Sequence, residues 1–261
     1  MEITTTPLWQ GQDNGLNITY YPPQGEARSS AVIVFPGGGY RVMAEHEARP
    51  YGEFFAGHGF HAFVADYRTN PNHFPLPLAD ARRAVRYVRL NAARYGISPE
   101  KIAVIGSSAG GHLAALLSTY REKIDFEMNG DAADEQDYLP NAQILCYPVI
   151  RLTGEIAHVG SGEKLLGEGW QERGDALSPD VLVTPDTPPA FMWHTAEDSC
   201  VDVRNSLTYG AALKAAGVPF EMHIYPDGFH GLGMCAREET FAVHDAAWKN
   251  AVVSWLNYIG F

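Results

Sequence analysis

A serine between glycines is the clearest chemical signal in this sequence. Residues 106–110 read Gly-Ser-Ser-Ala-Gly, a G-x-S-x-G pattern whose central residue is Ser108. Residues 101–105 have the apolar content of a buried strand and a helical pattern follows, so the serine lies on a sharp strand-to-helix turn. Glycines at both ends relieve the collisions that larger side chains would make there. We predict that Ser108 is a nucleophile and that Ser107 points away. In the alternative interpretation, Ser108 only caps the helix of a Gly/Ser-rich turn.

A serine hydroxyl needs a base within hydrogen-bond reach before it becomes a good nucleophile. The chain has ten histidines, so residue type alone does not identify the base. His230 has the right placement, because it follows the last predicted strand in a loop that precedes the last helix. His112, His194 and His223 fall within predicted helices or strands, where packed histidines are more common. We therefore predict that His230 is the base.

The orienting acid is expected in the loop after another buried strand. Asp198 directly follows the apolar residues 190–195, from where a carboxylate reaches the histidine loop and fixes its tautomer. Glu197 and Asp202 are rivals for this role. All three could instead be solvated loop charges.

A glycine-rich loop is the candidate for stabilising a developing oxyanion. Residues 36–40 read Pro-Gly-Gly-Gly-Tyr after an early strand, and consecutive glycines let backbone N–H groups turn inward. We predict that the amides of Gly38, Gly39 and Ala109 form an oxyanion hole. The alternatives are a plain turn or a phosphate cradle, and the latter is disfavoured because no Lys-Ser or Lys-Thr pair follows.

The elements that must position these residues alternate between strand-like and helix-like patterns, which predicts a parallel sheet with crossover helices. The expected strands cover residues 16–21, 31–35, 60–67, 101–105, 143–147, 190–195 and 220–225. The expected helices cover residues 47–58, 80–95, 109–120, 203–216 and 240–258. We predict a single domain over residues 1–261. The acidic stretch 125–138 is expected to be an exposed loop, and residues 150–189 an irregular cap-like insertion over the site or a surface excursion without a role.

Composition limits the partners. The 261 residues include 46% apolar and 19% charged residues, as in a folded globular protein, and carry a formal net charge of −12. Such a charge repels phosphate, so neither nucleic acid nor an anionic membrane surface is expected as a partner. The most basic helix is predicted to be an ordinary one whose solvated side carries Arg82, Arg83, Arg86, Arg89 and Arg94.

The few cysteines, and the lack of a predicted secretory or membrane-spanning segment, favour a reducing compartment. Three scattered cysteines are too few for a disulfide framework or a zinc cluster, so no metal is expected. The start of the sequence lacks a secretory pattern, and no run of about 18 apolar residues could span a bilayer. We therefore expect a cytoplasmic protein.

Several motifs together resemble the α/β-hydrolase esterase/lipase group. They lie at residues 36–40, 66–68 (Asp-Tyr-Arg), 106–113, 188–191 (Pro-Pro-Ala-Phe) and 227–231 (Asp-Gly-Phe-His-Gly). Within that group, the chain is similar to small acetyl xylan esterases and carbohydrate acetyl esterases. The resemblance implies a mostly parallel sheet of about eight strands with helices on both faces, the chain order Ser, Asp, His, and hydrolysis of short-chain esters without a cofactor. The sequence departs from the His-Gly-Gly-Gly form of related lipases by having Pro36 in place of histidine.

The substrate is less constrained than the chemistry. Acetylated sugars are candidates, and we expect the pocket to be lined by Tyr40, Tyr67, His73, Trp170 and Phe229, although such residues also serve as packing. The expected partner is a small-molecule ester, and a homodimer stays open. The alternative functions are a small peptidase of prolyl-oligopeptidase type and a binding protein that kept the fold without catalysis.

Overall fold

The strands form one eight-stranded sheet in the computed structural model, which describes residues 2–236 and 240–261. The order across the sheet is β1-β2-β4-β3-β5-β6-β7-β8. The strands are β1 (Thr4–Pro7), β2 (Asn17–Tyr21), β3 (Ala31–Phe35), β4 (His61–Ala65), β5 (Ile102–Ser107), β6 (Ala142–Cys146), β7 (Ala190–Thr195) and β8 (Phe220–Tyr225). From β4 across to β8 every neighbouring pair is parallel, whereas β1 and β2 run antiparallel to their neighbours. The mostly parallel sheet predicted from the sequence is confirmed.

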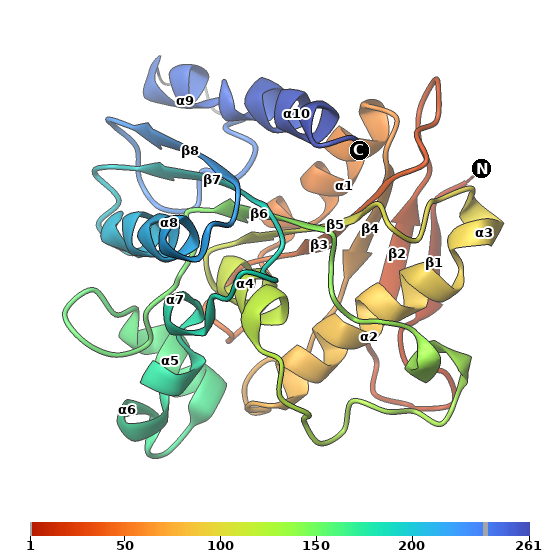
Figure 1. Cartoon of the computed structure of the whole chain (residues 1–261), viewed down its shortest axis with the longest axis horizontal. Helices are drawn as coiled ribbons and strands as arrows, with labels where there is room; N and C mark the ends of the chain where they lie inside the picture. The colour runs from red at the N-terminus through yellow and green to blue at the C-terminus, as the bar shows by residue number, and fades with distance from the viewer. Residues whose placement is uncertain (1, 237–239) are drawn as a thin grey trace.

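Helices cover both faces of this sheet (Figure 1). They are α1 (Arg49–Gly57), α2 (Leu76–Leu90), α3 (Ala92–Tyr95), α4 (Ala109–Thr119), α5 (Val159–Leu166), α6 (Trp170–Arg173), α7 (Pro179–Leu182), α8 (Arg204–Ala216), α9 (Thr240–Asp245) and α10 (Trp248–Tyr258). Helices α2, α4 and α8 pack in one core with alternate strand residues such as Ile33 and Val104, while α1 and α10 pack in a second core with Val32 and Ile105. Burial on both faces explains why the central strands are almost continuously apolar.

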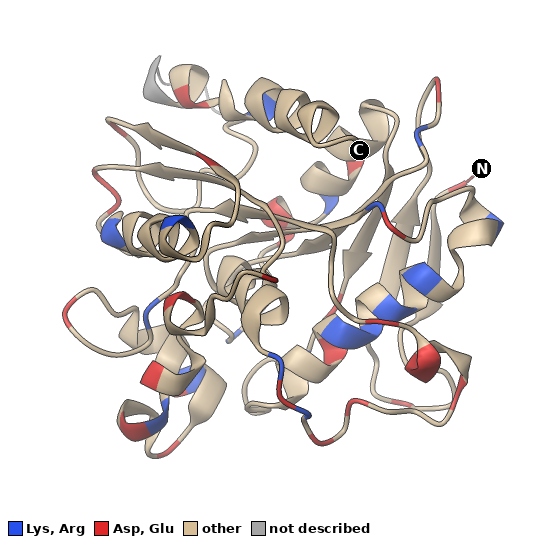
Figure 2. Ribbon diagram, in the orientation of Figure 1, with Lys and Arg blue, Asp and Glu red and all other residues tan. Residues whose placement is uncertain are grey.

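The basic side of α2 differs from its prediction. Arg82, Arg83 and Arg86 are buried, not solvated. The segment 125–138, predicted to be an exposed loop, folds against this helix face and supplies acidic partners, so blue bands on α2 face red segments in Figure 2. Arg82 forms an ion pair with Glu127 at 2.5 Å, and Arg83 one with Asp131 at 2.6 Å. The arginines are buried because each guanidinium has hydrogen-bonding partners there.

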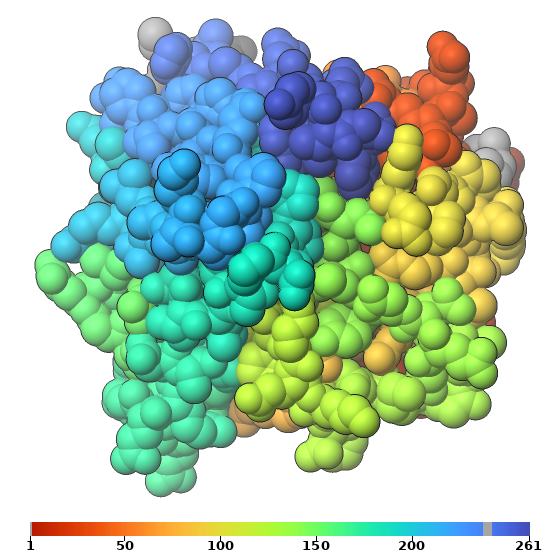
Figure 3. Space-filling view, viewed as in Figure 1, coloured from red at the N-terminus to blue at the C-terminus, as the bar shows by residue number. Residues whose placement is uncertain are grey.

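Residues 150–189 are more ordered than the predicted irregular insertion. They contain the short helices α5, α6 and α7 and a 3₁₀ turn at Asp175–Leu177. The segment forms the lower left part of the face in Figure 3, next to α4. Residues of this segment also line the cavity beside Ser108, as described below.

Other elements also differ from the predictions, and the predicted helix 80–95 is divided into α2 and α3. The edge strand β1 was not predicted, because Thr-Thr-Thr-Pro carries no apolar alternation. The last predicted helix, 240–258, is divided into α9 and α10. In the described residues, no helix has the length and apolar content required to cross a membrane.

Candidate active site

Ser108 lies on a strained turn between β5 and α4. Its φ is 55° and its ψ −120°, a conformation that a residue with a Cβ rarely adopts. The turn closes tightly, since a Cβ at Gly106 would lie 2.0 Å from the backbone oxygen of Gly110, and one at Gly110 would lie 2.1 Å from the backbone oxygen of Phe35. The two glycines therefore permit the turn. The neighbouring Ser107 donates its hydroxyl to the Tyr51 oxygen at 3.0 Å, away from the other site groups.

Three loops at the carboxyl ends of parallel strands bring Ser108, His230 and Asp198 together, which is where open α/β sheets usually bind ligands. Ser108 follows β5, Asp198 follows β7 and His230 follows β8. The His230 Nε2 lies 2.7 Å from the Ser108 Oγ, and its Nδ1 lies 2.6 Å from the Asp198 Oδ2. Because the carboxylate accepts a hydrogen bond from Nδ1–H, Nε2 is left to accept the serine proton.

Asp198 is held by more partners than the sequence indicated. Its Oδ1 accepts the backbone N–H groups of Cys200 and Val201, both at 2.9 Å, and its Oδ2 also accepts the Nε2–H of His194 at 3.2 Å. Burial raises the pKa of this carboxyl, but the hydrogen bonds from His194 and His230 outweigh burial and hold its pKa well below the usual value. Asp198 is therefore ionised when His230 must be oriented.

The rival acids lie elsewhere. Asp202 forms an exposed ion pair with Arg204 at 2.6 Å, and Glu197 is exposed. His194, predicted only as a core residue, is buried and accepts the Ser206 hydroxyl at Nδ1, at 2.8 Å. Its Nε2 faces two acceptors, the Asp198 carboxylate and the Val201 carbonyl at 3.0 Å, so this nitrogen carries the proton that His194 donates. The spacing of four residues between His194 and Asp198 was the available sequence signal.

The glycine loop after β3 is anchored by the carboxylate of Glu47, a residue that was not predicted from the sequence to support the site. One oxygen of this buried carboxylate accepts the Gly37 N–H at 2.9 Å, and the other accepts the Tyr147 hydroxyl at 2.6 Å. The Tyr147 oxygen in turn accepts the N–H of Gly233, from the loop that carries His230, at 2.8 Å. In addition, Tyr67 donates its hydroxyl to the Pro36 carbonyl at 2.5 Å. These bonds support a loop that lacks the histidine of related lipases.

His112 connects the same loop to the cap-like segment. Its Nδ1 accepts the Tyr40 hydroxyl at 2.7 Å, and its Nε2–H donates to the Leu177 carbonyl at 3.0 Å. Burial lowers the pKa of His112 to about 4, so this imidazole is neutral at physiological pH and the two bonds are complementary. His112 therefore joins α4, the glycine loop and residues 150–189.

A cavity of about 610 Å³ opens beside Ser108. Gly38 and Gly39 line it from the glycine loop, and Phe229 lines it next to His230. Ala109 is fully buried directly after Ser108, and its amide belongs to the first turn of α4, where helical N–H groups have no partner within the helix. Gly38 and Gly39 thus share the cavity with Ser108, and Ala109 follows the serine directly, while their role as an oxyanion hole stays a prediction.

Four of the aromatic residues predicted to line the pocket lie elsewhere. Tyr40 and Tyr67 are buried in the core, where each hydroxyl has the partner described above. His73 packs against Gly167 and binds the Lys164 carbonyl at 3.0 Å, and Trp170 packs against Gly162 of α5. The prediction is corrected for these residues, because their rings pack and hydrogen-bond within the fold away from the cavity wall.

Metal-binding residues do not gather near this site. Within residues 2–236 and 240–261, no group of three or more His, Cys, Asp or Glu side chains is arranged to hold an ion. The three cysteines are free, and the Cys200 Sγ lies 3.7 Å from the His158 Nε2 at the cavity wall.

The sequence matches the family model described as BD-FAE over residues 16–213. Endo-1,4-beta-xylanase B of Butyrivibrio fibrisolvens is 36% identical over 249 residues, covering 90% of this chain and 38% of that protein. Acetylxylan esterase of Xylanibacter ruminicola is 30% identical over 235 residues, covering 88% of this chain and 45% of that protein. The chain therefore spans less than half the length of these two curated relatives.

A solved structure matches over nearly the full chain. It is an acetyl ester-xyloside bifunctional hydrolase from Caldicellulosiruptor lactoaceticus, with a TM-score of 0.89 and 40% identity. The match covers 99% of this chain and 97% of that one, so the strands and helices described above are shared almost throughout.

Proposed function

Because the chain belongs to the BD-FAE family of α/β-hydrolases, we propose that it hydrolyses short-chain carboxylic esters through an acyl-Ser108 intermediate. One observation carries this proposal. The His230 imidazole bridges the Ser108 hydroxyl, at 2.7 Å, and the Asp198 carboxylate, at 2.6 Å, beside a cavity that can hold the ester.

The geometry supports a two-step mechanism. In the first step the Ser108 Oγ attacks the ester carbonyl carbon while the His230 Nε2 takes the hydroxyl proton. The tetrahedral intermediate collapses, the carbon–oxygen bond to the alcohol breaks, and His230 returns the proton to the departing alkoxide. In the second step His230 deprotonates a water molecule that attacks the acyl-serine, which releases the carboxylic acid and restores the Ser108 hydroxyl.

The amides of Gly38, Gly39 and Ala109 are proposed to stabilise the negative oxygen of both tetrahedral intermediates. Donors of this kind each contribute roughly a hundred- to a thousandfold in rate. The Glu47 carboxylate and the Tyr40–His112 pair hold the glycine loop, so these donors are set in place before substrate arrives. We propose no cofactor, because each proton and electron pair in the cycle is handled by the chain or by water.

Acetylated sugars are the proposed substrates, with Phe229 as a wall of the binding site. The named activities of the acetylxylan esterase and of the acetyl ester-xyloside hydrolase support this choice. Three unpaired cysteines support the reducing cytoplasm as the proposed compartment.

The test compares Ser108→Ala with Ser107→Ala on p-nitrophenyl acetate, p-nitrophenyl butyrate, an acetylated xylo-oligosaccharide and an aminoacyl p-nitroanilide. Ser108→Ala is expected to lower kcat by about 10⁶-fold on the esters. Ser107→Ala, which loses hydrogen bonds to Tyr51 and Cys146 and none to His230 or Asp198, is the matched control and keeps most of the activity. Faster cleavage of the anilide than of the esters, or a larger loss with Ser107→Ala, would contradict the proposal.

A further inference from the structure

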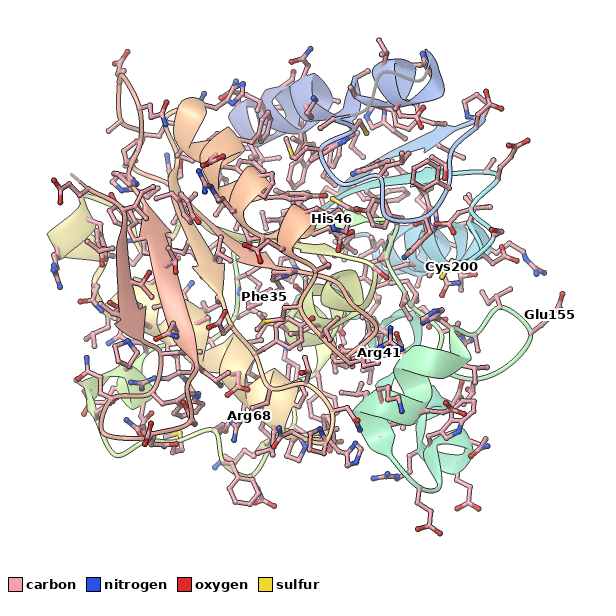
Figure 4. The ribbon with its side chains drawn as sticks, turned by 180° about the vertical axis from the view of Figure 1, so that it is seen from behind. Phe35, Arg41, His46, Arg68, Glu155 and Cys200 are labelled. Atoms are coloured by element: carbon pink, nitrogen blue, oxygen red, sulfur yellow. The ribbon has the colours of Figure 1, made fainter. Side chains whose placement is uncertain are left out.

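Two basic side chains line the cavity from opposite elements. Arg41 lies in the loop that continues the oxyanion glycines, and Lys164 lies in α5 of the cap-like segment. Arg41 is exposed and Lys164 is half-buried. Figure 4 shows Arg41 on the side of its loop that is next to α5. The two cations thus approach one opening from the scaffold and from the cap.

Neither cation has a partner within the part of the chain that the structure describes. No ion pair or side-chain hydrogen bond is formed there by Arg41 or Lys164, whereas the nearby Arg151 pairs with Asp180 at 3.0 Å. Arginine is well suited to bind a planar carboxylate through two parallel N–H bonds, and lysine supplies a mobile point charge. Both donors are available to a ligand in the cavity.

The cavity offers little negative charge to oppose them. Among the residues that the structure describes, the one acidic residue lining it is Glu47, whose side chain is only 3% exposed and already accepts hydrogen bonds from the Gly37 amide and the Tyr147 hydroxyl. A chain with a formal net charge of −12 would otherwise repel anions from its surface. Arg41 and Lys164 therefore make the cavity locally attractive to anions, although the protein as a whole repels them.

The size of the cavity indicates which part of the substrate meets these cations. Its volume of about 610 Å³ is in the range that holds a whole drug-sized ligand, roughly 300–1,000 Å³. A short acyl group fills a small part of that volume, so the alcohol part of the ester also lies inside. From these observations, and resting on the proposed function, we infer that Arg41 and Lys164 select esters whose alcohol part carries a carboxylate, as the alcohol of an acidic sugar does.

A matched pair of esters tests this inference. Para-acetoxybenzoate carries a carboxylate on its alcohol part, and its methyl ester has the same reacting acetate without the charge. We expect the ratio of kcat/KM for the anionic over the neutral ester to fall roughly three- to tenfold in Arg41→Gln and in Lys164→Gln, and further in the double variant. High salt should lower the same ratio in the unmodified protein. Lys214→Gln removes an exposed charge from α8, outside the cavity, and should leave the ratio unchanged.

The ratio of kcat/KM for the two esters tests charge selection separately from the esterase activity itself. An unchanged ratio in the double variant, with both esters hydrolysed, overturns the inference and leaves the esterase activity intact. Calorimetric binding of the two esters to Ser108→Ala supplies a readout independent of turnover. Tighter binding of para-acetoxybenzoate that is lost with Arg41→Gln supports the inference even if the unmodified protein hydrolyses neither ester, a result that would refute only the esterase function. Equal binding of the two esters overturns the inference.

Discussion

Two regions of the molecule hold a carboxyl group whose pKa lies well below its usual value, and they do so in different ways. Asp131, over the arginine face of α2, owes its lowered pKa first to hydrogen bonds from the Arg83 guanidinium. Asp198, beside His230, is buried, and burial disfavours its ionised form. Hydrogen bonds from His194, His230 and backbone amides outweigh that effect and lower its pKa. One carboxylate is stabilised by a permanent cation, and the other mainly by hydrogen bonds from imidazole and backbone N–H groups.

This difference separates a structural ion pair from the carboxylate of the proposed active site. Over α2, acidic side chains pair with the buried Arg82 and Arg83, so these charges need no ligand. Around Ser108 the backbone is strained, the imidazole links two oxygens, and the cations Arg41 and Lys164 are left for a ligand. A buried charge alone therefore does not identify a functional site. Charged side chains without a partner, next to a residue with a strained backbone, are a better indicator.

Among changes to the two carboxylates and their partners, the largest expected effect comes from Asp198→Asn. Loss of the carboxylate leaves His230 in the wrong tautomer, so kcat should fall by about 10⁴-fold. Steady-state hydrolysis of p-nitrophenyl acetate measures this loss. Asp202→Asn removes the charge of another aspartate of the same loop, which pairs with Arg204 at the surface, and serves as the control. If Asp202→Asn were the more damaging change, the acid would have to be reassigned.

On the structural side of the comparison, Arg82→Met should lower the free energy of unfolding by about 3–5 kcal/mol, because it leaves the buried Glu127 without its cation. Urea unfolding measures the loss, and kcat of the folded enzyme should not change. Arg49→Met breaks the exposed pair with Glu53 and should lower the free energy of unfolding far less than Arg82→Met does, because solvent screens exposed pairs. The double variant Arg82→Met, Glu127→Leu should recover most of the stability, and failure to do so would argue against the ion-pair explanation.

A smaller effect is expected where structure and catalysis meet. Tyr40→Phe removes the hydroxyl that binds His112 and should lower stability by about 1 kcal/mol. Because the glycine loop is less well fixed, kcat should also fall a few-fold while KM stays constant. Tyr87→Phe, which loses bonds to Thr6 at 3.1 Å and to Tyr95, is matched in chemistry and should not alter kcat. Equal kcat values for both variants would show that His112 does not position the loop.

The smallest effect concerns acid stability. The folded-state pKa values of Asp131 and Asp198 lie below those of the unfolded chain, so their stabilisation is present above about pH 4 and is lost as pH falls through the folded-state values. The stability difference between the unmodified protein and Asp131→Asn should therefore narrow as pH falls from about 5 to 2, in thermal unfolding followed by circular dichroism. Hydrolysis at neutral pH should not change. A difference that does not vary with pH would contradict the pairing with Arg83.

The sequence predicted the α/β-hydrolase fold because its strands are buried on both faces and its motifs fall at strand ends. The positions of Ser108, Asp198 and His230 followed from the same rule, and their catalytic roles stay predictions. The arginines of α2 were misassigned because helical periodicity shows which positions share a face but not what covers that face. Tyr40 and Tyr67 were placed at the pocket because they follow the glycine loop and a strand end, and the sequence does not show which way a ring at such a position points.

Partners that are distant in sequence were harder to find. Glu47 is separated from Tyr147 by a hundred residues, and His112 from Leu177 by 65. Neither pair has a local spacing that would reveal it, because the fold alone brings these groups together. Arg41 and Lys164 likewise become neighbours of one cavity only after the cap-like segment folds over it.

The tight turn around Ser108 has a consequence for the mutational tolerance of the enzyme. A methyl group at Gly106 or Gly110 would collide with backbone atoms, which cannot rotate aside as a side chain can. A saturation library should therefore be depleted of every substitution at these two positions, while the mouth of the cavity accepts many. Directed evolution of new specificity in this scaffold has its freedom at Arg41, Lys164 and Phe229, and almost none at the nucleophile turn.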